Sequence, residues 1–165
     1  MYKRQVPNAT NLAAHLAKPG YDPQQEYSFP YQWGTVGLVY RTSVIKVPPA
    51  EVSWNVILGD APAGRFLFMD EMKSCLGNVL RYQGKSANTV VPAEIKAAGD
   101  LLTKAKGNPK CLGFTGGVDG RDQVLKGDAD IAMVYNGDAV KVLPVDGSVA
   151  FANPKEGTVL WVDCM

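Results

Sequence analysis

RFLFMDE, residues 65–71, is the stretch that decides the fold. Its first five residues are almost continuously apolar, which predicts a buried strand. Asp70 follows this strand and is the expected N-cap of a helix. Apolar residues then recur three and four positions apart, as on one face of a helix: Met72, Cys75, Leu76, Val79 and Leu80. Glu71, Ser74 and Asn78 fall on a different face of the same helix.

The rest of the chain repeats this alternation of strands and helices. Further strands are expected over residues 33–40, 111–114, 130–135, 149–152 and 158–162, and helices over 11–17, 51–58 and 92–107, with shorter ones before Gly127 and after Tyr135. Gly34 and Gly37 in the first strand predict a bend or a close backbone approach. The glycine-rich run from Gly113 to Gly120 is expected to be a surface loop. The pattern predicts an α/β fold, with a mixed sheet and helices on both faces.

Composition excludes several classes of function. The 165 residues carry a net charge of +1, with no basic excess for nucleic acid. No apolar run approaches the roughly 18 residues of a membrane span. Three cysteines, Cys75, Cys111 and Cys164, form no metal-binding pattern and are expected to be core residues. His15 is the only histidine, and no nucleophile pattern accompanies it, so we expect neither an enzyme nor a cofactor or metal site.

Four segments, in this order and spacing, resemble the spermidine/putrescine-binding proteins of ABC importers: residues 27–35 (YSFPYQWGT), 68–71 (FMDE), 135–138 (YNGD), and 154–157 (PKEG) followed by 161–163 (WVD). The resemblance implies one lobe, the second, of a two-lobed type II periplasmic binding protein. It predicts an N-terminal helix and turn-rich lead-in over residues 1–26. Residues 27–165 would form a single α/β lobe with hinge-strand segments at both ends, and most of the first lobe has no counterpart.

The same resemblance implies a set of ligand residues. A polyamine needs carboxylates to pair its ammonium groups and aromatic rings to cover its methylenes. By resemblance, the acids are Glu71, Asp138 and Asp163, and the aromatic walls are Tyr135 and Trp161. Ser74 stands where several family members carry a second helix carboxylate, which leaves the preferred amine open.

Simpler roles exist for most of these residues. Glu71 in a first helical turn could serve only the helix dipole, and Asp138 could serve only as a cap. Tyr135 and Trp161 could be ordinary core aromatics. Asp163 and Trp161 are two residues apart on a predicted strand, so both side chains lie on one face, which suits a cation better than a core.

The leading hypothesis is non-covalent binding of a small organic cation, a polyamine such as putrescine or spermidine. The alternative is a homo-oligomeric interaction module, a homodimer that covers apolar hinge-strand surfaces without high-affinity ligand binding. A folded relic without activity is a third reading. An ABC permease is a partner by resemblance. The family implies the periplasm, but the first residues do not read as a signal peptide, which would indicate the cytoplasm for a complete chain.

Overall fold

The computed structural model describes residue 8 and residues 11–165. By its internal contacts the chain divides into two compact units. Unit 1 consists of residues 1–34 and 160–165, and unit 2 consists of residues 35–159. The predicted lead-in, residues 1–26, includes residues that lie outside the described ones. Its boundary with the lobe stays a prediction.

Five strands of the six-stranded mixed sheet follow the order β3-β2-β4-β1-β5 and lie wholly or partly in unit 2. Strand β2 is parallel to both β3 and β4, whereas β1 is antiparallel to β4 and β5. The strands are β1 (Pro30–Arg41, which begins in unit 1), β2 (Phe66–Met69), β3 (Cys111–Thr115), β4 (Ile131–Tyr135) and β5 (Val149–Ala152). The mixed sheet expected from the sequence is confirmed.

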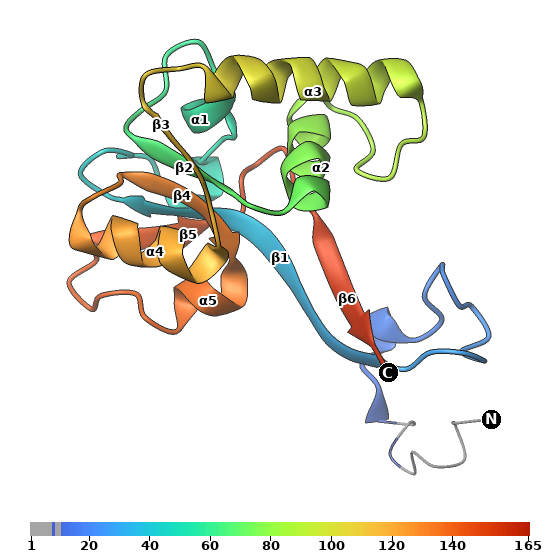
Figure 1. Ribbon diagram of the computed structural model, residues 1–165. Helices are drawn as coiled ribbons and strands as arrows, with labels where there is room; N and C mark the ends of the chain where they lie inside the picture. The colour runs from blue at the N-terminus through green and yellow to red at the C-terminus, as the bar shows by residue number, and fades with distance from the viewer. Residues whose placement is uncertain (1–7, 9–10) are drawn as a thin grey trace. The chain divides into compact units, whose positions relative to one another are not determined.

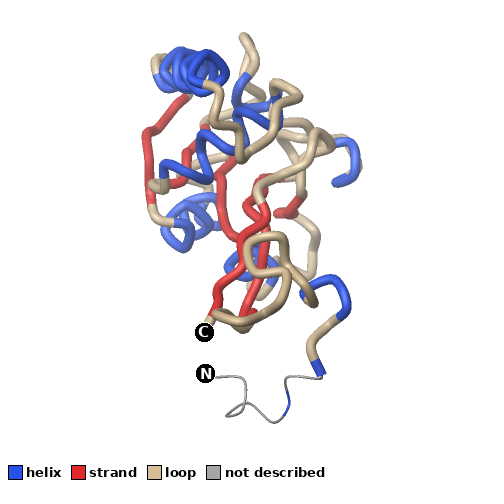
Figure 2. The backbone as a smooth tube through the Cα atoms, turned by 90° about the vertical axis from the view of Figure 1, so that its right-hand side faces the viewer, coloured by secondary structure: helices blue, strands red, loops and turns tan. Residues whose placement is uncertain are grey.

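Helices cover both faces of this sheet (Figures 1 and 2). On one face α4 (Gly117–Lys126) and α5 (Asn136–Val140) bury Val39, Leu67 and Ala132. On the other face α2 (Met72–Tyr82) places Cys75 against Met133. All four residues of β2 are buried, which is the expected burial of a strand that is covered on both sides.

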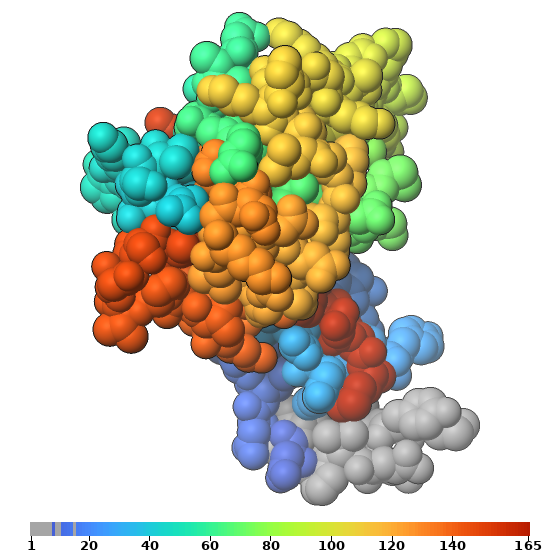
Figure 3. Space-filling model, turned by 60° about the vertical axis from the view of Figure 1, so that its left-hand side comes forward, coloured from blue at the N-terminus to red at the C-terminus, as the bar shows by residue number. Residues whose placement is uncertain are grey.

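Three further elements complete unit 2: η4 (Pro49–Glu51), α1 (Asn55–Leu58) and α3 (Pro92–Lys106). The prediction of a single helix over residues 51–58 is wrong, because this segment contains the end of the 3-10 helix η4 and the separate short helix α1. Figure 3 shows the face on which residues 117–126 and residues 136–148 lie side by side. None of the described helices has the length and apolarity that a membrane crossing requires.

The start of α2 corrects two expectations. Glu71, not Asp70, is the N-cap, because the Asp70 amide still donates to the carbonyl of Thr115 (2.8 Å) and so extends the strand pairing by one residue. Met72 is 72% exposed and does not belong to the buried face. It is the first residue of a helix that starts at the sheet edge, where there is no neighbouring layer to cover it.

Asn78 is a fully buried polar residue of α2. Its Oδ1 accepts hydrogen bonds from the Val159 amide (2.8 Å) and the Thr158 hydroxyl (3.0 Å). The first bond gives the buried side-chain oxygen a backbone donor, the Val159 amide. Together the two bonds attach residues 158–159, which precede β6, to helix α2. The sequence grouped Asn78 with Glu71, but its role in the structure is to hold unit 2 together.

Unit 1 contains β6 (Leu160–Cys164), which pairs with β1, and the short 3-10 helix η3 (Ala14–Leu16), which occupies part of the helix expected over residues 11–17. Phe29 and Met165 exchange two backbone hydrogen bonds, of 2.8 and 2.9 Å. Asp22 organises the loop before β1. Its carboxylate accepts hydrogen bonds from the Glu26, Tyr27 and Ser28 amides and from the Ser28 hydroxyl.

Candidate functional site

The candidate site of unit 2 lies where three neighbouring parallel strands end. Strands β3, β2 and β4 are adjacent and run in the same direction, so their carboxyl ends meet at one sheet edge. Glu71 follows β2, and Tyr135 is the last residue of β4, with Asp138 in the first turn of α5. Open α/β sheets bind ligands outside this edge.

Glu71 is held in place by the helix that it caps. Its carboxylate accepts from the Lys73 amide (2.9 Å) and the Ser74 amide (2.7 Å). Partial burial pushes the pKa of Glu71 upward, but hydrogen bonds from Ser74 and from both amides, together with the Lys73 charge, outweigh this effect and lower the pKa. Glu71 is therefore ionised at neutral pH. A carboxylate has about four acceptor positions, so these bonds leave it able to accept from a cation.

Ser74 lies behind Glu71. It is only 4% exposed, its amide donates to the Glu71 carboxylate (2.7 Å), and its side chain helps to lower the pKa of Glu71. In this geometry Ser74 orients the acid and contributes no charge of its own.

Asp138 differs from Glu71 because its carboxylate makes no hydrogen bond or ion pair with any described residue. Arg121 approaches the same residue, but its guanidinium donates to the Asp138 main-chain carbonyl (3.0 Å) and pairs with Asp122 (2.7 Å). The cap of α5 is Tyr135, whose side chain makes no capping bond. The half-buried Asp138 carboxylate is thus available to pair with a cation from outside.

Sequence reasoning missed a third component of this edge, the turn between β3 and α4. A Cβ atom built on Gly117 would lie 3.4 Å from Cδ2 of Tyr135, 3.5 Å from Oδ2 of Asp138 and 3.6 Å from Cε of Met69. The expectation of a plain surface loop over residues 113–120 is wrong, since this run contains the end of β3 and the first turn of α4. Gly117 lies shortly after β3 as Asp138 lies shortly after β4, so its distance from a strand end was the signal that could have selected it.

Trp161 and Asp163 belong to unit 1. Both are on β6, two residues apart, and so they lie on the same face of the strand, as the sequence predicts. Trp161 is half-buried and Asp163 is exposed. The strand therefore presents an indole and a carboxylate side by side.

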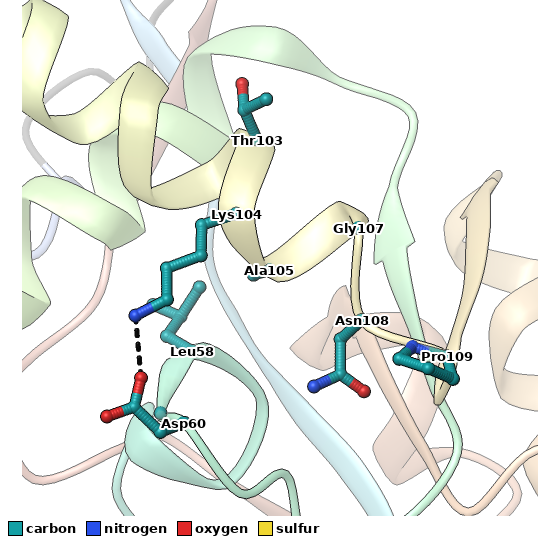
Figure 4. Close-up of a pocket in the computed structure, with 9 residues that line it drawn as sticks. Leu58, Asp60, Thr103, Lys104, Ala105, Gly107, Asn108 and Pro109 are labelled. Carbon is teal, nitrogen blue, oxygen red and sulfur yellow. Dashed lines mark hydrogen bonds and ion pairs between the residues drawn. The ribbon is translucent and has the colours of Figure 1, made fainter.

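Unit 2 also has a pocket of about 350 Å³ at the carboxyl end of α3 (Figure 4). None of the predicted ligand residues lines it. Its charged residues, Lys104 and Asp60, form an ion pair of 2.7 Å and neutralise each other. The hydrogen bond and charge of Lys104 lower the pKa of Asp60, and Asp60 raises the pKa of Lys104 in return. The pocket offers no unpaired charge to a ligand.

Comparison with known proteins identifies the family. The model of the bacterial extracellular solute-binding protein family matches residues 2–165. The spermidine/putrescine-binding periplasmic protein of Escherichia coli is 27% identical over 99% of this chain and 46% of its own length. The putrescine/cadaverine-binding protein of Pseudomonas aeruginosa is 30% identical over 99% of this chain and 48% of its own length. The chain spans about half the length of these curated relatives.

Solved structures agree on the fold. The spermidine/putrescine ABC transporter substrate-binding protein PotD of Streptococcus pneumoniae superposes with a TM-score of 0.78 at 21% identity, over 98% of this chain and 48% of that one. The TpPotD lipoprotein of Treponema pallidum gives a TM-score of 0.82 at 23% identity, over 98% and 50%. The resemblance expected from the sequence and the lobe-like α/β fold are both confirmed. The chain belongs to the bacterial extracellular solute-binding protein family.

Proposed function

We propose that this chain binds a small organic dication of the putrescine or spermidine type without covalent chemistry. The relatives that match nearly the whole chain are named for binding these amines. The observation that carries the proposal is the Asp138 carboxylate, which borders the Cβ position of Gly117 (3.5 Å) together with the Tyr135 ring (3.4 Å) and has no ion-pair partner among the described residues. An acid and an aromatic ring at the carboxyl edge of a sheet suit an ammonium group at the end of an alkyl chain.

In this proposal each residue has a distinct role. Asp138 and Glu71 accept hydrogen bonds from ammonium groups, and Ser74 orients Glu71. The Tyr135 ring covers methylenes and presents its face to the cation. Burial of an unpaired ammonium group costs several kcal/mol, so the acids are essential to the site. Trp161 and Asp163 on β6 are proposed as a second ring–acid pair of the same chemistry.

The names of the relatives support two further parts of the proposal. Periplasmic binding proteins and an ABC transporter substrate-binding protein are among them. We assign the chain to the same setting, as the ligand-binding component of an amine import system that delivers its ligand to an ABC permease.

Isothermal titration of the chain with putrescine and spermidine tests the proposal. Asp138→Asn removes one charged hydrogen-bond acceptor, which is worth about 1.5–3 kcal/mol, so affinity should fall about 10- to 100-fold. Asp100→Asn is the matched control, because Asp100 pairs only with Lys96 on the exposed face of α3. Butane-1,4-diol, which has the chain length of putrescine without the charges, should not bind.

Two results would contradict the proposal at different levels. Absence of heat with either amine up to millimolar concentration would remove the function. Equal affinity of wild type and Asp138→Asn would instead remove Asp138 from the site.

Two substitutions of Glu71 are needed to separate its two roles, because it caps α2 and is also proposed to bind the amine. Glu71→Gln keeps an acceptor oxygen for one of the two amides and loses the charge, so it should lower amine affinity and cost less stability than removal of the whole cap. Glu71→Ala loses the cap as well and should destabilise the fold by about 0.5–2 kcal/mol. If both variants lost stability equally and bound the amine normally, Glu71 would be only a cap.

A further inference from the structure

We infer that Asn136 couples amine binding to strand β1, through the hydrogen bond that its side chain accepts from the Thr35 amide. The inference rests on the proposed function and goes beyond the ligand residues. Asn136 is a positioning residue in this account: it does not bind the amine, and it connects the helical turn that contains Asp138 to the first residue of unit 2.

The Asn136 side chain continues the pairing of β1 with β4 past the end of β4. The antiparallel ladder ends at the pair Val36 and Tyr135, and α5 begins at the next residue. One position further along β1, the Thr35 amide donates to Oδ1 of Asn136 (3.1 Å). The side-chain carbonyl thus serves as the acceptor that a main-chain carbonyl provides within the ladder.

The same short helix contains the acid that is proposed to bind the ammonium group. Asn136 and Asp138 are two residues apart and belong to one turn of α5. Arg121 also holds this turn, because its guanidinium donates to the Asp138 carbonyl (3.0 Å). A cation that pairs with the Asp138 carboxylate restrains this turn further. The restraint reaches the Thr35 amide through a single side chain.

Thr35 is the residue at which β1 enters unit 2. Unit 1 includes Gly34 and unit 2 begins at Thr35, within one continuous strand. A second asparagine fixes the same residue without involving α5, since the Thr35 hydroxyl donates to Oδ1 of Asn153 (2.9 Å). Two asparagines therefore hold Thr35, and only Asn136 belongs to a helix with a proposed ligand residue.

The other end of unit 2 has a parallel arrangement. Val159 is the last residue of unit 2, and its amide donates to Oδ1 of Asn78 in α2, the helix that Glu71 caps. Each of the two helices that start beside a proposed acid thus holds one of the two residues at which the chain enters or leaves unit 2. Asn78 is fully buried, whereas Asn136 is half-buried, so Asn136 is the better residue to substitute.

The test compares Asn136→Ala with Asn153→Ala in an NMR titration with putrescine that follows the Thr35 amide resonance. Putrescine should shift this resonance in wild type and in Asn153→Ala, and the shift should be lost in Asn136→Ala. Because coupling between two sites is reciprocal, loss of the bond should also lower putrescine affinity. The expected decrease is about two- to tenfold, the value of one neutral hydrogen bond, and Asn153→Ala should bind as wild type does.

A purely structural asparagine would give a different result. Asn136→Ala would then melt at a lower temperature but keep wild-type affinity and the putrescine-induced shift at Thr35. That outcome, or an unshifted Thr35 resonance in a wild-type chain that binds putrescine, would overturn the inference and leave the proposed function intact. A wild-type chain that binds no amine would overturn both.

Asp138→Asn provides a second variant if Asn136→Ala does not fold. At saturating putrescine the shift of the Thr35 resonance should be smaller in Asp138→Asn than in wild type, because the cation no longer restrains α5 through a carboxylate. A shift of equal size in the two proteins would overturn the inference.

Discussion

Glu71 and Asp138 show how two acids in similar sequence contexts acquire different properties. Each follows a strand and lies at the start of a helix, but only Glu71 is engaged by backbone amides. These bonds offset the cost of partial burial and keep the acid ionised. The Asp138 carboxylate accepts no such hydrogen bond from the described residues, so it keeps its capacity to accept one. The availability of a carboxylate thus depends on the partners of each residue more than on residue type.

The lowered pKa of Asp22 predicts how the stability of the fold depends on pH. Burial pushes its pKa upward, but the four hydrogen bonds that it accepts outweigh burial and lower the pKa from 3.8 to about 2. A carboxyl group with a lowered pKa in the folded state stabilises that state at all pH values above 3.8. This contribution should disappear as the pH falls through the interval from 3.8 to about 2.

Thermal unfolding of wild type and Asp22→Asn between pH 2 and pH 6 measures this effect. The variant should melt below wild type at pH 6, and the difference should shrink as the pH approaches 2. Ser28→Ala, which removes one of the four hydrogen bonds, should show a smaller difference with the same pH dependence. A difference that does not vary with pH would show that the charge of Asp22 does not stabilise the fold.

At the scale of elements, the central strand β1 depends on a glycine. A Cβ atom on Gly37 would lie 2.4 Å from the Ala152 carbonyl oxygen and 2.5 Å from Cζ of Phe151, both on the neighbouring strand β5. The close backbone approach that the sequence predicts is therefore confirmed at Gly37. Because the Ala152 carbonyl belongs to the backbone of β5, which is paired with β1, the strand must shift to admit the methyl group, and Gly37→Ala should destabilise the fold by about 1–3 kcal/mol.

Denaturant unfolding with Gly20→Ala as the control tests this prediction. A Cβ atom on Gly20 meets nothing within 4 Å, so that variant should unfold close to wild type. A Gly37→Ala protein as stable as wild type would mean that β1 and β5 separate at little cost.

At the scale of the whole molecule, unit 1 exposes large apolar side chains. Tyr27 is 85% exposed, Tyr31 68% and Leu160 57%. Exposed apolar surface promotes association. We therefore predict that the isolated chain self-associates with rising concentration, and the homodimer stays a prediction on this basis.

Light scattering coupled to size exclusion over a concentration series would detect the association. The double variant Tyr31→Ser/Leu160→Ser should remain monomeric to a higher concentration than wild type. Val90→Ser, at an 86% exposed position of unit 2, should behave as wild type does. A wild-type chain that stays monomeric at the highest concentration would contradict the prediction.

The sequence by itself determined the alternation of strands and helices and the position of Glu71, Tyr135 and Asp138 at or shortly after the ends of strands. These features depend on periodicity and on turns, which are local properties of the chain. Only the tertiary structure decided that Glu71 caps α2, that Met72 is exposed and that a side chain at position 117 would meet Tyr135 and Asp138. Those outcomes depend on the pairing of Asp70 with Thr115 and on the order of β3, β2 and β4. Strand order and register arise from contacts between residues distant in the chain, and no local pattern encodes them.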